Sequence, residues 1–377
     1  MAKKVIVGLS GGVDSSVAVY ELLKAGYDVE AMFMRNWDSA TNNDVLGNPD
    51  LNDDVCPQEK DYQDAVAVAE KLNVKLHRID FIEEYWDNVF TYFIEEYKAG
   101  RTPNPDIMCN KYIKFASFKD EAMRLGADYI AMGHYARVRH DSDGSRLLRG
   151  VDTNKDQSYF LCMISQEQLK CSMFPIGDLT KPEVREIASR LDLATAKKKD
   201  STGICFIGER NFHKFLQNYL PAKPGKMVTL DGKEIANHDG LMYYTIGQRK
   251  GLGIGGRGDS DNDAWFVLGK DLEKNYLYVG QGFNNPYLYS DRCLATNCNF
   301  ILDVPVSGKK YQAKFRYRQP DQEVMVEILA NNQMMVYYPQ KVRAVSPGQA
   351  VVLYDGEICL GGGIIDKVYN NDELRKY

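Results

Sequence analysis

The feature that most constrains the fold is a glycine-rich stretch near the start of the chain, GLSGGVDSS, at residues 8–16. It follows an apolar run, VIV at residues 5–7, that is typical of a buried strand, and it precedes a helix-like stretch that Gly26 closes. Glycines between a strand and a helix let backbone N–H groups close on an anion at the positive end of the helix. The stretch therefore predicts phosphate binding at the first strand–helix turn of an α/β sheet.

This loop differs from the two commoner phosphate-binding motifs. It has neither the lysine and spacing of GxxxxGK[ST] nor the spacing of GxGxxG. Ser10, Ser15 and Ser16 offer hydroxyls, whereas Asp14 is an acid that suits a phosphate site only if a metal ion intervenes. A Gly-Gly turn with a serine helix cap is the purely structural alternative, but the complete string SGGxDS is much rarer than such a turn.

The string resembles the pyrophosphatase-type loop of enzymes that release pyrophosphate and leave AMP on a substrate. GMP synthetase, NAD synthetase and argininosuccinate synthetase carry this signature. An enzyme that cuts between the α and β phosphates must hold pyrophosphate, so it can dispense with a lysine for the terminal phosphate. The resemblance implies that ATP is a substrate of this chain.

The pattern of apolar runs divides the chain into three parts. Strand-like and helical stretches alternate up to about residue 135, and another helix begins near Lys181, which predicts βαβ units and a Rossmann-like parallel sheet. After about residue 210, short alternating runs between Asp-Gly and Pro-Gly turns predict β-hairpins. We expect an α/β ATP-pyrophosphatase catalytic domain over 1–210, a small mixed middle domain over 211–284 and a C-terminal all-β barrel over 285–377.

Composition excludes several classes of protein. Of 377 residues, 44% are hydrophobic and 26% are charged, and no apolar run approaches the ~20 residues of a membrane span. The beginning of the chain lacks a secretory signal, so we expect a cytoplasmic protein without membrane contact. The net charge of −5 argues against indiscriminate coating of nucleic acid but allows a local basic patch. Eight cysteines form no CxxC pair and the five histidines do not cluster with them, so no zinc site is expected.

Two loops have ambiguous patterns. Residues 36–56 are polar and lack lysine and arginine, and a loop of this length is either a functional lid or disordered. The run GLGIGG at residues 251–256 matches GxGxxG, but no helix pattern follows it. We therefore expect a flexible loop there and not a dinucleotide site.

Two cysteines lie in loop contexts beside basic residues. Cys109 stands where a helix begins in TPNPDIMCNKYIKF, three residues after Asp106 and close to Lys111 and Lys114. A helix N-terminus and nearby cations stabilise a thiolate. Cys205 lies in the Gly- and Ser-containing stretch KKKDSTGICFIGER. Each cysteine alone could be structural, but a pair lets one carry sulfur as a persulfide that the other displaces.

Seven stretches occur in the order found in tRNA-specific 2-thiouridylases: SGGVDSS, FMRNW, TPNPDIMCNKYIKF, GHYAR, DQSYFL, STGICFIGER and RYRQ. They span nearly the whole chain and are far more specific than the loop alone, so the sequence is identified as a member of that family. The resemblance implies a sulfurtransferase that uses ATP and Mg²⁺. Its expected reaction is thiolation at C2 of the wobble uridine in the tRNAs for lysine, glutamate and glutamine, with release of AMP and pyrophosphate.

The resemblance assigns a nucleotide site at the strand ends. The residues that match ATP contacts of the family are Gly8, Leu9, Ser10, Gly11, Gly12, Val13, Asp14 and Ser15, with Met34 and Gly133 at the adenosine. Met34 and Gly133 each end a predicted strand, and parallel sheets bind ligands at the carboxyl ends of their strands.

The resemblance also assigns the catalytic residues. Cys205 matches the persulfide cysteine of the family, Cys109 its nucleophile and Asp106 its general acid/base. ATP would adenylate the uridine O2, after which either the persulfide sulfur attacks C2 or Cys109 liberates that sulfur as sulfide. A Cys109–Cys205 disulfide would end the cycle and require reduction. The implied partners are tRNA and a persulfide donor protein, either a cysteine desulfurase or a relay carrier.

Further positions match tRNA contacts of the family. Asn104, Pro105 and Asp106 would hold the target base once it is flipped out of its stack. The remaining matches are His134, Lys155, Asp156, Gln157, Arg316, Tyr317 and Gln349. The stretch KKYQAKFRYRQ from Lys309 interleaves cations with aromatic residues, which suits RNA binding, although a merely solvated strand face is the alternative. His134 could equally be a hydrogen-bonded histidine at a strand end.

Two other classes of function fit part of the sequence. A small-molecule synthetase that forms AMP would account for the loop but not for the basic aromatic strand or the two loop cysteines. A non-catalytic RNA-binding or sulfur-carrier protein would account for those features but would leave the loop without use. ATP–pyrophosphate exchange and AMP formation distinguish the three possibilities.

Overall fold

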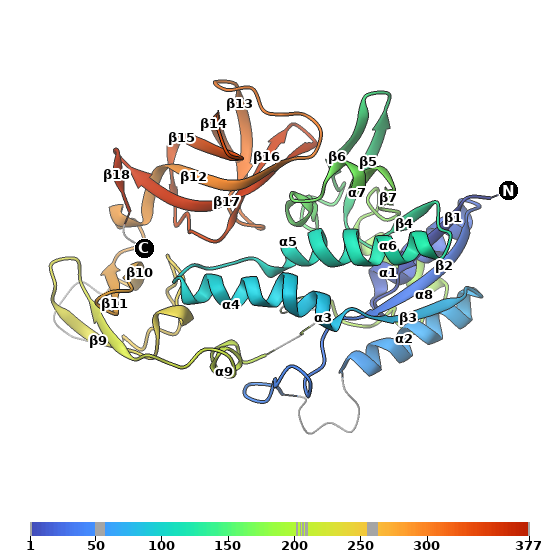
Figure 1. The fold of residues 1–377 in the computed structure, drawn as a ribbon, viewed down its shortest axis with the longest axis horizontal. Coiled ribbons are helices and arrows are strands. Elements are labelled where there is room, and N and C mark those ends of the chain that lie inside the picture. The colour runs from blue at the N-terminus through green and yellow to red at the C-terminus, as the bar shows by residue number, and fades with distance from the viewer. Residues whose placement is uncertain are drawn as a thin grey trace.

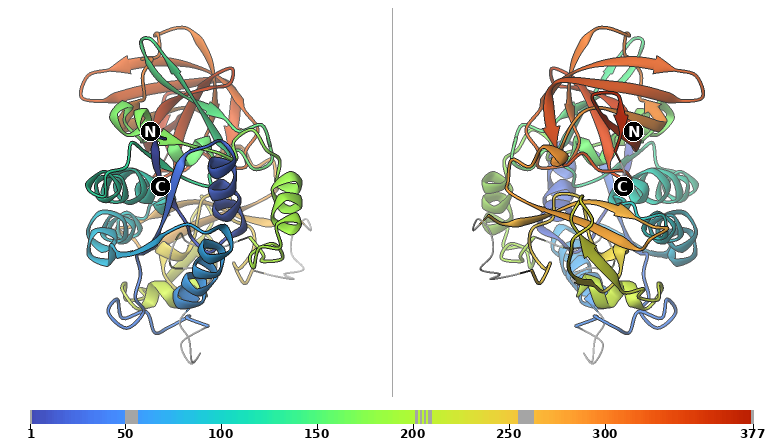
Figure 2. Two further views of the ribbon diagram at one scale, coloured as in Figure 1. Left: turned by 90° about the vertical axis from the view of Figure 1, so that its right-hand side faces the viewer. Right: turned by 90° about the vertical axis from the view of Figure 1, so that its left-hand side faces the viewer.

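A parallel sheet covered by helices lies at one end of the molecule, and a β-barrel lies beside it (Figure 1). The computed structural model describes residues 2–49, 57–200, 203, 205, 207, 210–254 and 263–375. Two views at right angles to the first show the barrel strands above the α/β layers (Figure 2). The Rossmann-like sheet and the barrel expected from the sequence are confirmed. Residues 50–56 of the polar loop and the last two glycines of GLGIGG lie outside the described residues.

The parallel sheet has the strand order β3-β2-β1-β4-β7. Its strands are β1 (Lys4–Gly8), β2 (Asp28–Arg35), β3 (Leu76–Asp80), β4 (Tyr129–Ala131) and β7 (Ser172–Met173). Successive residues of β1 enter different cores, since Ile6 belongs to one hydrophobic cluster and Val5 and Val7 belong to another. A strand buried on both faces has a continuous apolar sequence, which explains the VIV run.

Helices cover both faces of this sheet. One face carries α1 (Val13–Lys24), α2 (Pro57–Leu72) and α8 (Lys181–Arg190). The other carries α3 (Ile82–Tyr85), the π-helix η1 (Trp86–Phe90), α4 (Thr91–Lys98), α5 (Pro105–Cys109), the π-helix η2 (Asn110–Ser117) and α6 (Phe118–Arg124). The short helices η3 (Ser158–Leu161) and α7 (Gln166–Lys170) follow β4 along the chain. None of the helices in the described ranges is long and apolar enough to cross a membrane.

The middle part of the chain forms a small sheet of its own with the strand order β10-β11-β8-β9. Its elements are α9 (Phe212–Gln217), β8 (Gly225–Val228), β9 (Glu234–His238), η4 (Leu241–Tyr243), β10 (Trp265–Asp271) and β11 (Tyr276–Gln281). Strands β8 and β11 are parallel, while the β10–β11 and β8–β9 pairs are antiparallel.

The C-terminal barrel closes because β12 pairs with both β15 and β17, at the two ends of the order β12-β15-β14-β13-β16-β17. Its elements are η5 (Pro286–Leu288), β12 (Tyr289–Phe300), β13 (Lys310–Lys314), β14 (Gln322–Leu329), β15 (Gln333–Arg343), β16 (Ala350–Asp355), β17 (Ile358–Asn370) and β18 (Glu373–Leu374). Register shifts in β12 supply the bends that a small barrel requires.

A hairpin from the N-terminal half extends the barrel sheet. Strands β5 (Ala136–Asp141) and β6 (Gly144–Arg149) pair with each other, and β6 also pairs with β17 through Leu147 and Cys359. One hydrophobic cluster runs through both parts, since it contains Ile107 of α5 together with Val352 and Ile364 of the barrel. The α/β part and the barrel therefore share a core.

The described part of the polar loop, residues 36–49, is ordered and packs against the segment that follows Cys205. Asp44 is fully buried and forms an ion pair of 2.9 Å with Arg210, which is also buried. Asp44 accepts a further hydrogen bond of 3.1 Å from the Trp37 indole. Gly47 has φ +76°, and a Cβ there would lie 2.6 Å from the carbonyl oxygen of Asn211. The loop thus fixes the C-terminal end of the Cys205 segment.

The buried ion pair yields a stability prediction. Asp44→Ala removes the acceptor from two buried donors, so we expect the free energy of unfolding to fall by about 3 kcal/mol. Asp178→Ala is the matched control, because that carboxylate is 80% exposed in its ion pair with Arg137 and should change stability by less than ~0.5 kcal/mol. Urea unfolding measures both variants, and an equal, small loss in the two would contradict the role assigned to Asp44.

Candidate active site

The glycine-rich loop is tightly packed at the carboxyl end of β1. Gly11 has φ +72°, and a Cβ on this residue would lie 2.1 Å from the carbonyl oxygen of Asp61. A Cβ on Gly133 would lie 2.8 Å from the backbone nitrogen of Ser15. Only glycine fits at these two positions, so the loop after β1 packs closely on α2, and the chain after β4 packs closely on the start of α1.

The other predicted ATP residues divide into core and loop positions. The side chains of Leu9, Val13 and Met34 are buried, so they pack in the core and do not face a ligand at the loop. Ser15 Oγ donates to the carbonyl of Gly12 at 3.0 Å and accepts from the backbone nitrogen of Ser10 at 3.2 Å. These bonds keep the loop in shape and leave its remaining backbone N–H groups for an anion.

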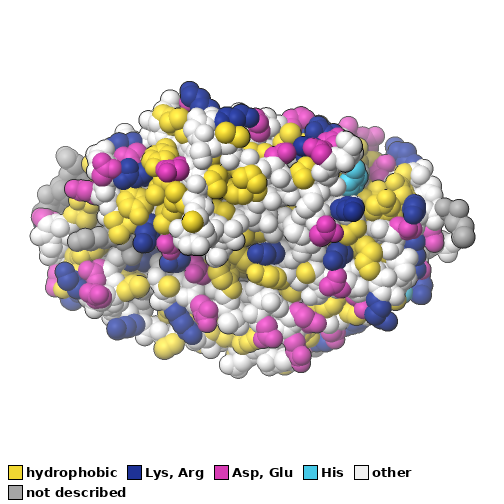
Figure 3. All heavy atoms as spheres, turned by 45° about the horizontal axis from the view of Figure 1, so that its top comes forward, with side chains coloured by type: hydrophobic (Ala, Val, Ile, Leu, Met, Phe, Trp, Pro, Cys, Tyr) yellow, Lys and Arg dark blue, Asp and Glu magenta, His cyan; other side chains and the backbone are white. Residues whose placement is uncertain are grey.

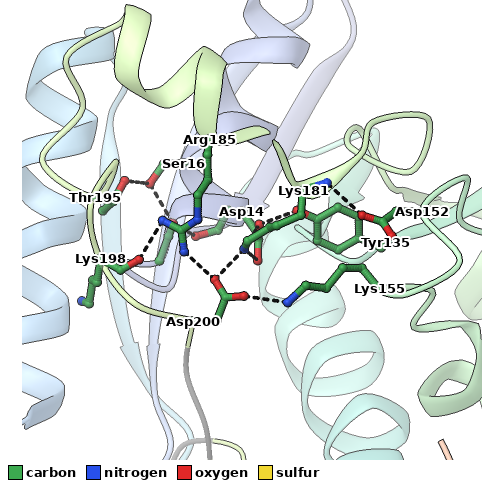
Figure 4. A network of polar contacts seen from close by, with 12 residues as sticks. Asp14, Ser16, Tyr135, Asp152, Lys155, Lys181, Arg185, Thr195, Lys198 and Asp200 are labelled. Carbon is green, nitrogen blue, oxygen red and sulfur yellow. Dashed lines mark hydrogen bonds and ion pairs between the residues drawn. The ribbon is translucent and has the colours of Figure 1, made fainter. Parts of the chain in front are cut away.

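Asp14 is the centre of a polar network that the sequence did not reveal (Figure 4). The Lys181 ammonium lies 2.7 Å from Asp14 Oδ1, and the Tyr135 hydroxyl donates to the same oxygen at 2.7 Å. Lys181 also contacts Asp200 at 2.7 Å. The three cations that contact Asp200 are Lys155, Lys181 and Arg185, each within 2.7–2.8 Å.

Each cation of this network lies beside a carboxylate. Burial alone would raise the pKa of Asp200, but its ion pairs with Lys155 and Lys181 outweigh burial and lower the pKa to about 2. A further cation, Lys198, lies 2.9 Å from the carbonyl oxygen of Gly11 and pairs with both Asp61 and Asp64. A phosphate at the loop would therefore have to replace carboxylates as the partners of these cations.

The metal expectation was tested against the available carboxylates. Within the described ranges, no group of three or more His, Cys, Asp or Glu side chains could hold a metal ion. Mg²⁺ commonly needs only one or two protein carboxylates when it is bound through substrate phosphates. Asp14, the acid inside the loop, is such a carboxylate, but the Lys181 ammonium contacts both of its oxygens, so Lys181 would have to turn away before Asp14 could hold Mg²⁺.

The two predicted cysteines meet in space although they are far apart in the sequence. The sulfur atoms of Cys109 and Cys205 are 3.9 Å apart. Asp106 Oδ1 accepts a hydrogen bond of 3.2 Å from the backbone nitrogen of Cys205, and the Tyr85 hydroxyl donates to its carbonyl oxygen at 2.8 Å. Cys109 is fully buried and Cys205 is partly buried. The three residues assigned to catalysis therefore form one cluster.

The π-helical winding of η2 supplies this cluster with a cation. Residues five apart stack above one another in a π-helix, so Lys114 lies on the face of Cys109, its fifth predecessor. A hydrogen bond from the Cys109 thiol lowers the pKa of Cys205; burial opposes this, and the charge of Lys114 lowers the pKa further. Burial raises the pKa of Cys109. Of the two thiols, Cys205 therefore loses its proton more readily.

The pKa values of Asp106 and His134 are shifted in the directions that favour the neutral forms of both side chains. Burial raises the pKa of Asp106, although the charge of Lys114 partly offsets this effect. Burial and the charge of Lys114 both lower the pKa of His134 far below its ordinary value. His134 is buried between the rings of Phe115 and Phe174, and its Nδ1 has no hydrogen-bond partner.

The thiol cluster and the glycine-rich loop are parts of one site. The charge of Lys114 contributes to the lowered pKa of His134, and the preceding residue, Gly133, packs on Ser15 of the loop. Asp200, which is held by the Asp14 network, precedes Cys205 by five residues, a length of chain that spans at most ~18 Å. The carboxyl ends of the strands thus bring the predicted phosphate loop and the sulfur chemistry together.

The residues expected to hold the target base and the tRNA have varied surroundings. Asn104 caps α5 through a hydrogen bond from the Asp106 backbone, and Pro105 follows in the first turn. Asp156 is buried and accepts from the backbone of Gly150 and Ser158. Lys155 pairs with Asp200, and Gln157 exchanges hydrogen bonds with the Tyr135 backbone.

The barrel residues expected at the tRNA form internal contacts. Arg316 donates to the carbonyls of Ile246 and Ala344 and to the Ser346 hydroxyl. Tyr317 reaches the carbonyl of Lys155 at 3.3 Å, and Gln349 donates to the carbonyl of Thr102 at 2.7 Å. Lys309 and Lys310 pair with Asp355 and Glu323. On the face in Figure 3, acidic and basic side chains are interspersed.

Similarity to known proteins extends over the whole chain. Family models match a tRNA methyl transferase HUP domain at residues 3–209, a tRNA methyl transferase PRC-barrel domain at 213–281 and an aminomethyltransferase beta-barrel domain at 290–365. A protein of Acholeplasma laidlawii named tRNA-specific 2-thiouridylase MnmA is 60% identical over 100% of both chains. Its namesake in Staphylococcus carnosus is 57% identical, over 97% of this chain and 96% of the relative. The chain belongs to the tRNA-specific 2-thiouridylase family.

Two solved structures share only a distant likeness with this 2-thiouridylase family member. A 4-thiouridine synthetase in complex with RNA and ATP has a TM-score of 0.33 and 14% identity, over 57% of this chain and 50% of the other. NMN synthetase from Francisella tularensis has a TM-score of 0.32 and 17% identity, over 53% and 67%. Similarity this low carries no argument about function.

The cluster predicts that Lys114 controls the reactivity of Cys205. Lys114→Met removes the nearby positive charge, so the pKa of Cys205 should rise and its alkylation by iodoacetamide at pH 7 should slow roughly ten-fold. Peptide mass analysis follows Cys205 alone across a pH series. Lys111→Met, on the same helix, is the control and should leave the rate within about two-fold. A Cys205 rate that is the same in both variants and the unmodified protein would refute the assignment.

Proposed function

We propose that this chain catalyses ATP-dependent 2-thiolation of the wobble uridine in the tRNAs for lysine, glutamate and glutamine. The observation that carries the proposal is the 3.9 Å approach of Cys109 and Cys205 beside Asp106, in a chain that belongs to the 2-thiouridylase family. Relatives at 60% and 57% identity are named tRNA-specific 2-thiouridylases, which supports thiolation of a tRNA uridine.

Activation begins at the glycine-rich loop. The uridine O2 attacks the α-phosphorus of ATP, pyrophosphate departs, and the oxygen becomes part of an adenylate. Backbone N–H groups of the loop and the cations around Asp14 suit the leaving pyrophosphate. Asp14 would hold Mg²⁺ together with the phosphates, and the ion would neutralise phosphate charge.

Sulfur transfer follows from the different proton affinities of the two thiols. Cys205, whose pKa is lowered, is suited to take up sulfur as a persulfide from a donor protein. In one route the terminal sulfur attacks C2 and AMP departs, after which Cys109 attacks the Sγ of Cys205 and releases the 2-thiouridine. In the other route Cys109 attacks the Sγ of Cys205 first, and the released sulfide then attacks C2 and displaces AMP. Both routes break the S–S bond of the persulfide and end with a Cys109–Cys205 disulfide. An external dithiol then reduces that disulfide.

Asp106 is suited to exchange a proton with the base or the departing group. Burial raises its pKa, which brings a carboxyl group closer to the operating pH of a general acid/base. Its place beside Cys205 puts that proton at the sulfur cluster. Asn104 and Pro105 hold the start of the same helix and would line the pocket for the flipped base.

The first test replaces the persulfide cysteine. Cys205→Ser should lower thiolation by at least ~10³-fold, because serine cannot carry a persulfide, while tRNA affinity stays within about two-fold. Purified protein, ATP, a persulfide source and unmodified tRNA are incubated, and the nucleosides are analysed by mass. Cys171→Ser, a partly buried free cysteine away from the cluster, is the control.

The same assay separates the rival functions. Retained thiolation in Cys205→Ser would remove this residue from the mechanism. ATP–pyrophosphate exchange that a small acid stimulates, and tRNA does not, would favour a small-molecule synthetase. Tight tRNA binding without any AMP would favour a non-catalytic RNA-binding or sulfur-carrier protein.

The second test probes the glycine-rich loop. Gly11→Ala forces a Cβ against the Asp61 carbonyl and requires an unfavourable φ, so the loop must move and ATP affinity should fall at least about ten-fold. Gly26→Ala is the control, since φ there is +84° but a Cβ would meet nothing within 4 Å. Calorimetric titration with ATP compares the two variants. Equal ATP affinity in both would show that the loop does not bind the nucleotide.

A further inference from the structure

The segment that leads into the catalytic helix is held from outside its own domain. Helix α4 ends at Lys98, a turn with Gly100 at φ +74° follows it, and the chain then runs to Asn104, the cap of α5. Thr102 receives contacts from the barrel, because its backbone nitrogen donates to Pro347 at 3.0 Å and its carbonyl accepts from Gln349. This approach segment, residues 100–104, fixes where Asp106 and Cys109 stand.

The middle sheet contacts the same segment through a buried lysine. Lys270 of β10 is only 2% exposed, and its Nζ donates to the carbonyl oxygen of Gly100 at 2.7 Å. Leu272, two residues further, packs against Gly100. The Thr245 hydroxyl lies 3.2 Å from the hydroxyl of Thr102. These contacts join the middle sheet to the approach segment.

The burial of Lys270 costs desolvation free energy. Among the described residues it forms an ion pair with no carboxylate, and burial lowers its pKa to about 7. Both the charged and the neutral amine can donate to the Gly100 carbonyl, so this contact persists on either side of that pKa. A methionine of similar length would fill the site without desolvating an amine. Stability alone therefore does not account for a lysine here.

We propose that Lys270 is a positioning residue for the reaction: by holding the Gly100 carbonyl, it sets the place of the segment that carries Asp106 and Cys109. The proposal rests on the roles proposed above for these two residues. In this proposal the middle sheet contributes to catalysis through Lys270, although Lys270 contacts neither thiol. Because the Gly100 carbonyl is held in place, the short stretch of chain from Gly100 to Asn104, the cap of α5, is held in place as well.

The test measures catalysis, thiol geometry and stability in Lys270→Met. We expect kcat for tRNA thiolation to fall about ten-fold with KM for tRNA within about two-fold, since small misplacement of reacting groups slows chemistry without loss of binding. The rate at which diamide, a two-electron oxidant, converts the Cys109 and Cys205 thiols into a disulfide should fall as well. The unfolding midpoint should change little, because the loss of the hydrogen bond to Gly100 offsets the removal of a buried amine.

Control variants make the outcome decisive. Lys274→Met, an exposed lysine in the β10–β11 turn, should match the unmodified protein in every measurement. Thr245→Val removes the second contact to the segment with little change of shape, and should also slow disulfide formation.

Unchanged kcat and unchanged disulfide rates in Lys270→Met would overturn the proposal. A loss of kcat in Lys270→Met with a lowered unfolding midpoint and normal disulfide formation would overturn it as well. The diamide measurement needs neither tRNA nor ATP, so it still decides the matter if the unmodified chain thiolates no tRNA.

Discussion

The electrostatics of the predicted thiol site depend on one interaction, the approach of the Lys114 ammonium to the Cys109–Cys205 pair. Burial disfavours charge at each member of the cluster, as the raised pKa values of Cys109 and Asp106 indicate. The nearby thiols and Asp106 raise the pKa of Lys114 against the effect of its own burial. A thiolate at Cys205 and an ammonium at Lys114 therefore stabilise each other. The π-helical turn allows this because it places a residue five positions later on the cysteine face.

The geometry of this cluster is a property of the whole chain and not of one domain. Residues 36–49 and Arg210 hold one end of the Cys205 segment, and the Asp200 ion pairs hold the other. The barrel and the middle sheet hold the approach to Cys109. A core that continues from α5 into the barrel leaves little freedom between these parts. Two thiols from distant segments can therefore stay within 3.9 Å of each other without a covalent bond.

Local patterns in the sequence predicted much of this arrangement. The VIV run, the SGGVDSS loop and the helix at Lys181 were all readable, because burial on both faces, close backbone approach and helix capping each leave a local signature. The roles of Cys109 and Cys205 came from a family resemblance. Their proximity could not be derived from spacing, since it depends on how two loops pack.

What the sequence did not reveal depends on long-range contacts. The β5–β6 hairpin lies within the predicted first domain, yet it pairs with the barrel strand β17. Lys181 stands in the first turn of a helix, where a cation is unfavourable, and its contacts with Asp14 and Asp200 explain it. Residues 36–49 are polar, and their order comes from partners in α9 and at Arg210. Polarity and length alone do not distinguish such a loop from a disordered one.

The charge distribution constrains how tRNA could be held. The sequence KKYQAKFRYRQ has five cations, but the structure pairs Lys309 and Lys310 with carboxylates and directs Arg316 into the protein. A phosphate that binds at Lys309 or Lys310 must replace an existing anion, and exposed ion pairs are weak enough for such exchange, at about 0–1 kcal/mol each. Exchange releases fewer counterions than binding at free cations does. Lys309 and Lys310 can therefore contribute only modestly to the binding of phosphate.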